Sequence, residues 1–218
     1  MSTFVVDELA EYMFQKAKAH SIDEDLTAAL QRPSRLSPVE AQLLEMFERH
    51  GFLHHLPNPQ VANSPWFLLG TRHGKDTADA LKYSDYRRSL SALTEAVPIL
   101  SIDSYIGVED LVNGQRYPRS MSQDPLWTKF VDALSDVSYG GRNDLRLVDE
   151  LRAQDDTGLF PTQLWAQFAR GVFAHMQEIH VPGQRIYLMG NTLVPGVAKL
   201  CADAQVPYVA MVQRRDAG

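Results

Sequence analysis

The chain has 218 residues, of which 44% are hydrophobic and 22% are charged. This composition excludes disordered, collagen-like and coiled-coil proteins and predicts a globular chain of one or at most two domains. Twenty-seven acidic residues against 21 basic ones give a net charge of -6. Because the sequence lacks the basic stripe that attracts phosphate backbones, we expect neither nucleic acid nor a membrane surface as a partner.

The single cysteine and the first residues of the chain indicate the cellular compartment in which the protein works. Cys201 has no second cysteine to pair with, which excludes an internal disulfide and a thiolate zinc site and fits a reducing environment. The start from Met1 to Glu8 lacks the basic and long apolar regions of a cleaved secretion signal, and no later apolar run is long enough to span a membrane. We therefore expect a cytoplasmic protein. Secretion into a host cell by a route that needs no cleaved signal is the alternative.

The first part of the chain has a helical pattern. Residues 3–50 place apolar residues at helical spacing, and the run from Ser37 to Glu40 matches a capping box with proline at the first helical position. His50 and Gly51 end that helix. We expect residues 1–56 to form a helical layer added to the rest of the molecule.

Residues 57–218 are expected to form an α/β core, and short apolar runs and turn residues indicate where its strands and helices begin and end. The first βαβ unit is predicted from a strand at Trp66–Leu69, a helix over residues 79–96 and a strand at Ile99–Ile102 that ends on Asp103. Residues 106–157 are polar, and we expect them to form a helical insertion with helices at 125–135 and 143–153.

A second βαβ unit is predicted near the end of the chain. A helix that begins at Pro161 has one broad apolar face, and it precedes a strand at 185–189, a helix at 194–204 and a strand at 208–212. The sequence therefore predicts an α/β fold with a mainly parallel central sheet of about four or more strands and helices on both faces, with the helical layer added. We expect one compact domain.

Polar residues follow the predicted strands, where open α/β sheets place their chemistry. The first strand ends in the run Gly70-Thr71-Arg72-His73-Gly74-Lys75. A histidine acts as a general base when an acid orients it, and the thirty-residue separation of His73 from Asp103 is what one loop and one helix produce. The alternative is that His73 is an ordinary loop histidine and Asp103 a helix cap.

Basic residues beside His73 suit an anionic or polar substrate. Arg72 and Lys75 would make the mouth of such a site cationic, although solvated surface charge explains them equally well. The sequence contains no nucleophile elbow, Walker loop or dinucleotide-binding glycine motif, which excludes the commonest α/β enzymes.

The run from Leu69 to Gly74 resembles the glycine-x-x-histidine motif of the superfamily that unites erythromycin esterases, ChaN-like haem-binding proteins and the TraB/GumN/Tiki group. Asp103 stands where that superfamily has an acid after the second strand, and the loop with Asn191 follows a late strand, as in the family. The resemblance covers residues 66–103 and 163–212. It implies that Lys82 or Arg87 serves as a basic residue of the site, with ordinary helix-surface charge as the alternative.

The sequence departs from the superfamily at three positions. Thr71 replaces the usual acid after the first glycine, Asp103 stands where glutamate is commoner, and Gly190-Asn191 replaces a histidine. Few metal ligands are left, so we expect no tightly bound metal and no cofactor, with haem as the remaining alternative.

Two functional hypotheses follow. The first is a hydrolase-like enzyme in which His73 and Asp103 are catalytic and Gly70, Arg72, Lys75, Lys82, Arg87 and Asn191 bind a small polar or anionic substrate. The second is a non-catalytic binding protein or bacterial effector that uses the same cleft to engage a host or cellular protein. The sequence leaves the oligomeric state open.

Overall fold

The protein is described here by a computed structural model of the chain. It describes residues 36–56, 65–71, 84–108, 111–112, 115–116, 125–134, 137–140 and 162–213. The helices predicted before residue 36 and at 143–153 lie outside the described residues.

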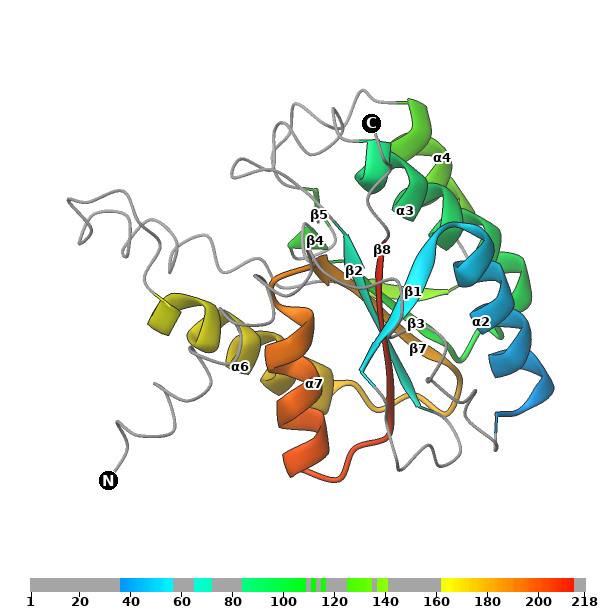
Figure 1. The fold of residues 1–218 in the computed structure, drawn as a ribbon. Helices are drawn as coiled ribbons and strands as arrows, with labels where there is room; N and C mark the ends of the chain where they lie inside the picture. Colours follow the sequence, from blue (N-terminus) through cyan, green and yellow to red (C-terminus); the bar gives the residue numbers. More distant parts are fainter. Residues whose placement is uncertain are drawn as a thin grey trace.

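A six-stranded sheet with the order β1-β8-β2-β7-β3-β6 forms the centre of the described part (Figure 1). Its strands are β1 (Phe52–Leu56), β2 (Trp66–Thr71), β3 (Tyr105–Val108), β6 (Ser138–Gly140), β7 (Arg185–Gly190) and β8 (Tyr208–Gln213). All neighbouring strands are parallel except β1, which pairs antiparallel with β8. The expected α/β fold with a mainly parallel sheet is confirmed. A separate antiparallel pair joins β4 (Leu111–Val112) to β5 (Gln115–Arg116).

Helices cover both faces of the sheet, as expected. One face packs against α2 (Pro38–Arg49), α3 (Ser84–Ala96) and α4 (Pro125–Ala133), and the other against α6 (Thr162–Glu178) and α7 (Val194–Asp203) (Figure 1). Two apolar cores result, one on each face of the sheet.

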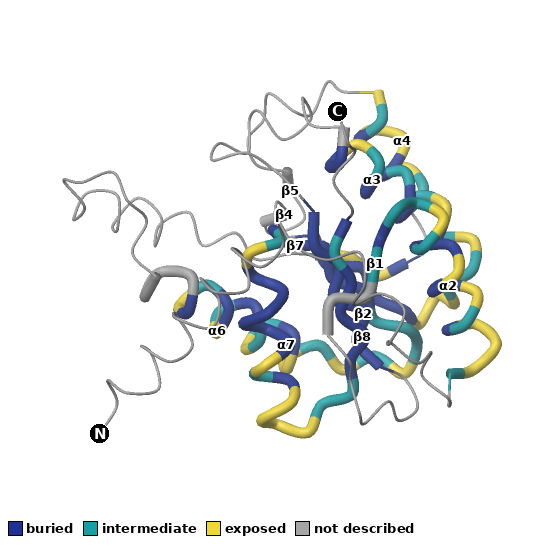
Figure 2. Tube along the Cα trace, viewed as in Figure 1, coloured by how far each residue is buried: buried dark blue, intermediate teal, exposed yellow. Residues whose placement is uncertain are grey.

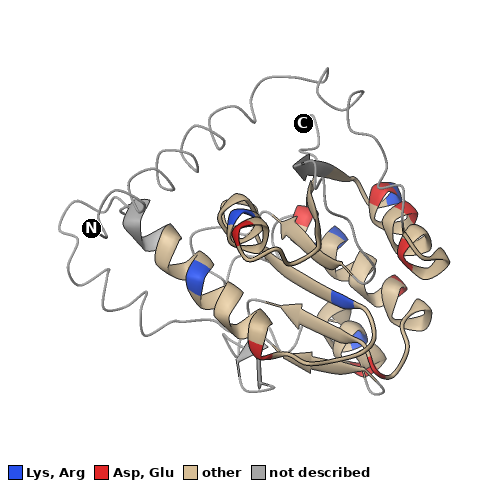
Figure 3. Cartoon of the chain, turned by 90° about the horizontal axis from the view of Figure 1, so that it is seen from below, with Lys and Arg blue, Asp and Glu red and all other residues tan. Residues whose placement is uncertain are grey.

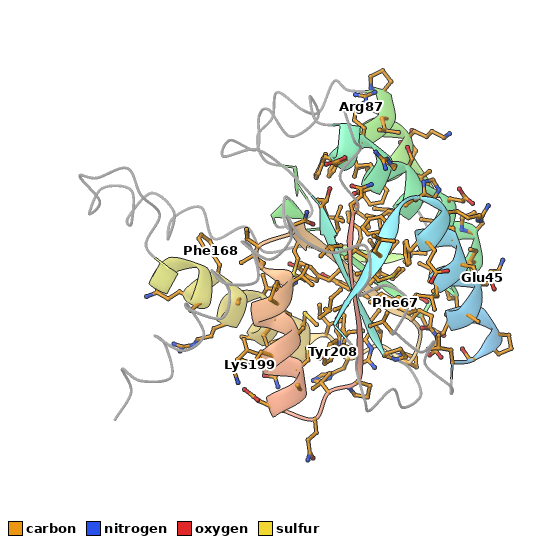
Figure 4. All side chains as sticks on the ribbon, viewed as in Figure 1. Glu45, Phe67, Arg87, Phe168, Lys199 and Tyr208 are labelled. Atoms are coloured by element: carbon orange, nitrogen blue, oxygen red, sulfur yellow. The ribbon has the colours of Figure 1, made fainter. Side chains whose placement is uncertain are left out.

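The central strand β2 is buried on both faces, which explains why its sequence does not alternate between apolar and polar residues. Phe67 and Leu69 enter the core under α2 and α3, whereas Trp66 and Leu68 enter the core under α6 and α7. Phe67, labelled in Figure 4, has its ring centroid 5.9 Å from that of Phe47 in α2. A strand buried on both sides needs apolar residues at successive positions, and the central strands are the most buried part of the trace in Figure 2.

The predicted capping box at the start of α2 is confirmed. The Ser37 hydroxyl accepts a hydrogen bond from the main-chain N–H of Glu40 at 3.3 Å, and the Glu40 carboxylate accepts one from the N–H of Ser37 at 2.7 Å. These reciprocal bonds satisfy two donors that a helix start otherwise leaves unpaired.

The second predicted strand, Ile99–Ile102, is wrong. Val97–Ile99 form a short 3-10 helix (η3), the chain turns at residues 101–104, and the strand β3 begins only at Tyr105. The apolar run includes Pro98, which fixes a helical φ angle and has no N–H for a sheet ladder. Ile102 is 72% exposed, so this run does not have the burial of a central strand.

Two further boundaries need correction. Residues 52–56 belong to the sheet as the edge strand β1, so the expected helical layer does not extend through them. The expected helical insertion at 106–157 contains α4, but also most of β3 and the whole of β6, both strands of the central sheet. Gly107 and Gly140 weaken the strand pattern in these segments, because glycine is disfavoured in strand interiors.

Charge is spread over the described helices. Acidic and basic residues are interspersed along them in Figure 3. None of the described helices is long and apolar enough to span a membrane.

Candidate functional site

The chain leaves the neighbouring strands β2 and β7 toward opposite faces of the sheet. From β2 the chain continues to α3 on one face and then to β3, whereas from β7 it continues to α7 on the other face and then to β8. Ligands of open α/β sheets bind at such a topological switch point, outside the carboxyl ends of the two strands. We call Gly70, Thr71, Gly190 and Asn191 the switch point.

Two predicted binding residues, Gly70 and Asn191, meet at the switch point. Thr71 pairs with Gly190 across the two strands, and the main-chain N–H of Asn191 donates a hydrogen bond to the carbonyl of Thr71 at 2.9 Å. A Cβ at position 70 would lie 2.7 Å from Asn191 Oδ1 and 2.8 Å from Val194 Cγ2. Glycine is therefore required at position 70 for the start of α7 to approach the sheet this closely.

The side-chain oxygen of Asn191 is buried without a hydrogen-bond partner in the described part of the chain. Buried polar atoms of this kind are rare, and a carbonyl oxygen without a partner suits a ligand group that donates a hydrogen bond. Just beyond it, α7 begins with Leu193 as N-cap and no side-chain cap. An uncapped helix start presents main-chain N–H groups and favours negative charge.

On the α3 face, three buried polar side chains join the ends of β2 and β8 to the helix. Ser89 Oγ lies 2.8 Å from Thr71 Oγ1 and 2.9 Å from Gln213 Oε1. The exposed fractions of Thr71, Ser89 and Gln213 are 1%, 0% and 4%. We call Thr71, Ser89 and Gln213 the hydroxyl cluster.

An acid and a base flank the hydroxyl cluster on α3. Asp85 is buried one helical turn before Ser89, and its main-chain carbonyl accepts a hydrogen bond from the Ser89 hydroxyl at 2.9 Å. The Asp85 carboxylate lies 3.5 Å from the Arg88 guanidinium. Arg88 also reaches the turn before β1, because a Cβ at Gly51 would lie 2.9 Å from Arg88 Nη1. The carboxyl edge of the sheet thus holds an ion pair in which the acid is nearly buried and the arginine is partly exposed.

The predicted position of Asp103 is wrong. This residue lies in the turn before β3, where its carbonyl accepts a hydrogen bond from the N–H of Gly183 at 3.0 Å. Tyr105 is in register with Arg185, the first residue of β7, so Asp103 lies at the amino edge of the sheet. Thr71 ends β2 at the opposite edge, about 17 Å away at about 3.3 Å per strand residue. The position of Asp103 gives no support to a pairing with His73.

Several predicted site residues cannot be placed. His73, Arg72, Lys75 and Lys82 lie outside the described residues. Arg87 lies exposed on α3 (Figure 4), and its neighbour Arg88 is the residue that reaches the carboxyl edge.

Sequence reasoning missed Asp85, Ser89 and Gln213. One signal was available, because Asp85 and Ser89 are four residues apart and so share a face of the helix that follows β2. A second was the glutamine at the end of an otherwise apolar strand.

Metal ligands and the single thiol add no further chemistry in the described part. No group of three His, Cys, Asp or Glu side chains comes together among the described residues. Cys201 is fully buried, and burial raises the pKa of its thiol to about 12. Cys201 is therefore a core residue, and a thiol that stays protonated at neutral pH is a weak nucleophile.

No protein-family model, curated protein or solved structure matches this chain. The resemblance to the erythromycin esterase superfamily therefore stays a prediction. The functional interpretation rests on the side chains at the carboxyl edge.

Proposed function

We propose that the protein binds a small polar or anionic molecule at the switch point and hydrolyses it with His73 as general base. The observation that supports this most is the contact between Gly70 and Asn191, two residues that the sequence assigns to the site. They meet where the chain leaves adjacent parallel strands toward opposite faces, which is the usual ligand position in open α/β sheets.

The charge of the ligand follows from the groups near the switch point. The start of α7 has no side-chain cap, and the positive end of the helix dipole there favours an anion. In the sequence, Arg72 and Lys75 follow Thr71 within four residues and add two cations. A phosphate or carboxylate group on the ligand would complement both.

Asp103 has no part in this proposal, because it lies at the other edge of the sheet. The described carboxylate at the carboxyl edge is Asp85, which is nearly buried and paired with Arg88. A general base needs an acid or another acceptor that orients its ring, and Asp85 is the acid we assign to this task.

The test is a hydrolysis screen of the purified protein on carboxylic esters, lactones and phosphate monoesters. We expect His73→Ala to reduce turnover by about 100-fold or more, because general-base catalysis contributes about that much. The matched control is His180→Ala, since His180 is exposed and precedes β7 on the amino side of the sheet.

Retained turnover in His73→Ala, or an equal loss in His180→Ala, would show that His73 is not the base. Ligand binding at the switch point without any turnover would instead favour the second hypothesis, a non-catalytic binding protein.

A further inference from the structure

Thr71 makes hydrogen bonds both to side chains on the α3 face and to the main chain at the end of β7. Its side chain points to the α3 face, where the hydroxyl meets Ser89 and Gln213. Its main-chain carbonyl accepts the N–H of Asn191, which begins the connection to α7 on the other face. Thr71 is thus the residue through which the hydroxyl cluster contacts the switch point.

The hydroxyl cluster has the features of a rigid support. All three side chains are almost fully buried, and the distances from Ser89 Oγ to Thr71 Oγ1 and Gln213 Oε1 are 2.8 and 2.9 Å. A hydroxyl carries a single proton, so Ser89 donates to one acceptor at a time and the Thr71 hydroxyl supplies the second proton. Removing one member takes a hydrogen-bond partner from both of the others, which are buried, and this is unfavourable.

The bond from Asn191 to Thr71 fixes the start of the connection between β7 and α7. Asn191 then packs its side chain against Gly70, within the space that a Cβ would occupy. A small displacement of Thr71 therefore moves the Asn191 main chain, and with it the side-chain amide that packs against Gly70.

We propose that Thr71 is a positioning residue, held by Ser89 and Gln213, that fixes Asn191 at the switch point. This rests on the proposed function only in that Asn191 is taken to bind the ligand. A purely structural role for the hydroxyl cluster makes a different prediction, because it would stabilise the whole sheet without any particular effect on Asn191.

The first experiment measures amide hydrogen exchange by NMR in the ligand-free protein, so it does not depend on any activity. The variants are Thr71→Val and Ser89→Ala. Their matched controls are Thr94→Val and Ser91→Ala, because both control hydroxyls lie on α3 and bond a carbonyl four residues earlier, as Ser89 does, but lie away from the switch point.

We expect the Asn191 amide to exchange about tenfold faster, relative to the amides of Leu188 and Met189, in both test variants. In the control variants this ratio should stay at its wild-type value. The proposal is overturned if all amides of β7 accelerate by the same factor as Asn191, or if Asn191 does not accelerate. Ser89→Ala decides the question if Thr71→Val does not fold.

The second experiment titrates inorganic phosphate into the same variants. Thr71→Val and Ser89→Ala should weaken phosphate binding by about five- to tenfold, and Thr71→Ser, which keeps the hydroxyl, should restore it. Absence of phosphate binding in the wild-type protein would count against the proposed anionic ligand, while the exchange ratio would still decide whether Thr71 positions Asn191.

Discussion

The two edges of the central sheet use polar residues in different ways. At the amino edge, Ser104 and Asp103 accept the N–H groups of Gln184 and Gly183, so these polar atoms close a turn between neighbouring segments. At the carboxyl edge, Thr71 joins α3 on one face to the β7–α7 connection on the other. The arrangement at the amino edge completes a turn. The arrangement at the carboxyl edge holds the ends of β2 and β7, from which the chain leaves toward opposite faces.

An unpaired buried amide does not by itself distinguish the edges. Gln184 Oε1 at the amino edge and Asn191 Oδ1 at the carboxyl edge are both buried without a hydrogen-bond partner among the described residues. What differs is that Asn191 lies at the carboxyl edge, where open α/β sheets bind their ligands beside strands whose connections leave for opposite faces. The position at the carboxyl edge therefore carries more weight for the site than the state of a single polar atom.

Two alanine substitutions should give the largest effects and test both edges. A Cβ at Gly70 would lie 2.7 Å from Asn191 Oδ1, and a Cβ at Gly183 would lie 2.6 Å from the main-chain carbon of Asp103. Both contacts are too short to persist. We expect Gly70→Ala and Gly183→Ala each to lower the free energy of unfolding by about 1–3 kcal/mol, measured by urea titration.

Ligand binding should separate these two variants. Only Gly70→Ala displaces Asn191, so only this variant should also weaken phosphate binding when both are compared at equal folded fraction. Equal phosphate affinity in the two variants would remove the functional distinction between the edges.

An effect of comparable size is expected in the hydroxyl cluster. Ser89→Ala removes a partner from Thr71 and Gln213, both nearly fully buried, so the free energy of unfolding should fall by about 1–3 kcal/mol. Ser91→Ala, on the same helix but away from the cluster, should change it by less than about 0.5 kcal/mol. If urea unfolding gave similar losses of free energy for Ser89→Ala and Ser91→Ala, the buried hydroxyl cluster would add nothing to stability.

The strands that the sequence predicted correctly are those with short apolar runs bounded by turn residues. β2, β7 and β8 are buried on both faces, and their runs end at glycine or glutamine. The strand β3 was missed because Gly107 interrupts its pattern. The structure explains that glycine, since a Cβ there would lie 2.2 Å from the ring of Tyr187.

The site was predictable only where it follows directly from chain order. Gly70 follows the predicted strand at Trp66–Leu69 and Asn191 follows the predicted strand at 185–189, so both were predicted. The contact between Ser89 and Gln213 joins residues 124 positions apart, and it depends on β8 lying beside β2. Nothing in a single sequence gives that strand order. The position of Asp103 could not be predicted for a similar reason. The edge of the sheet at which it lies depends on where β3 begins.

A pH-dependent effect is expected where Glu95 of α3 meets the end of α2. The Glu95 carboxylate lies 2.7 Å from His50 Nε2 and 2.9 Å from Arg49 Nη2, and the hydrogen bond with His50 is the main cause that lowers the pKa of Glu95 below 4.5. The folded state therefore favours the charged form. Its stabilising effect is complete above the unfolded pKa and is lost as the pH falls through the lowered folded pKa.

Glu95→Gln should consequently reduce the acid dependence of stability. Urea unfolding at pH 7 and at pH values below 4.5 should show a smaller difference for Glu95→Gln than for the wild-type protein. The effect is small because the pair is exposed to solvent. An unchanged difference would mean that the contact with His50 does not persist in solution.

The smallest expected effect is that of Asp103→Ala, and it tests the comparison of the edges most directly. The carbonyl of Asp103 accepts the N–H of Gly183, and alanine keeps that bond, so the free energy of unfolding should change by less than about 0.5 kcal/mol. Turnover that depends on His73 should stay at the wild-type rate. Asp85→Asn provides the contrast, because Asp85 is the buried carboxylate at the carboxyl edge and its loss should reduce turnover. If Asp103→Ala abolished turnover in a folded protein while Asp85→Asn did not, the site would have to include the amino edge, and the assignment to the switch point would be wrong.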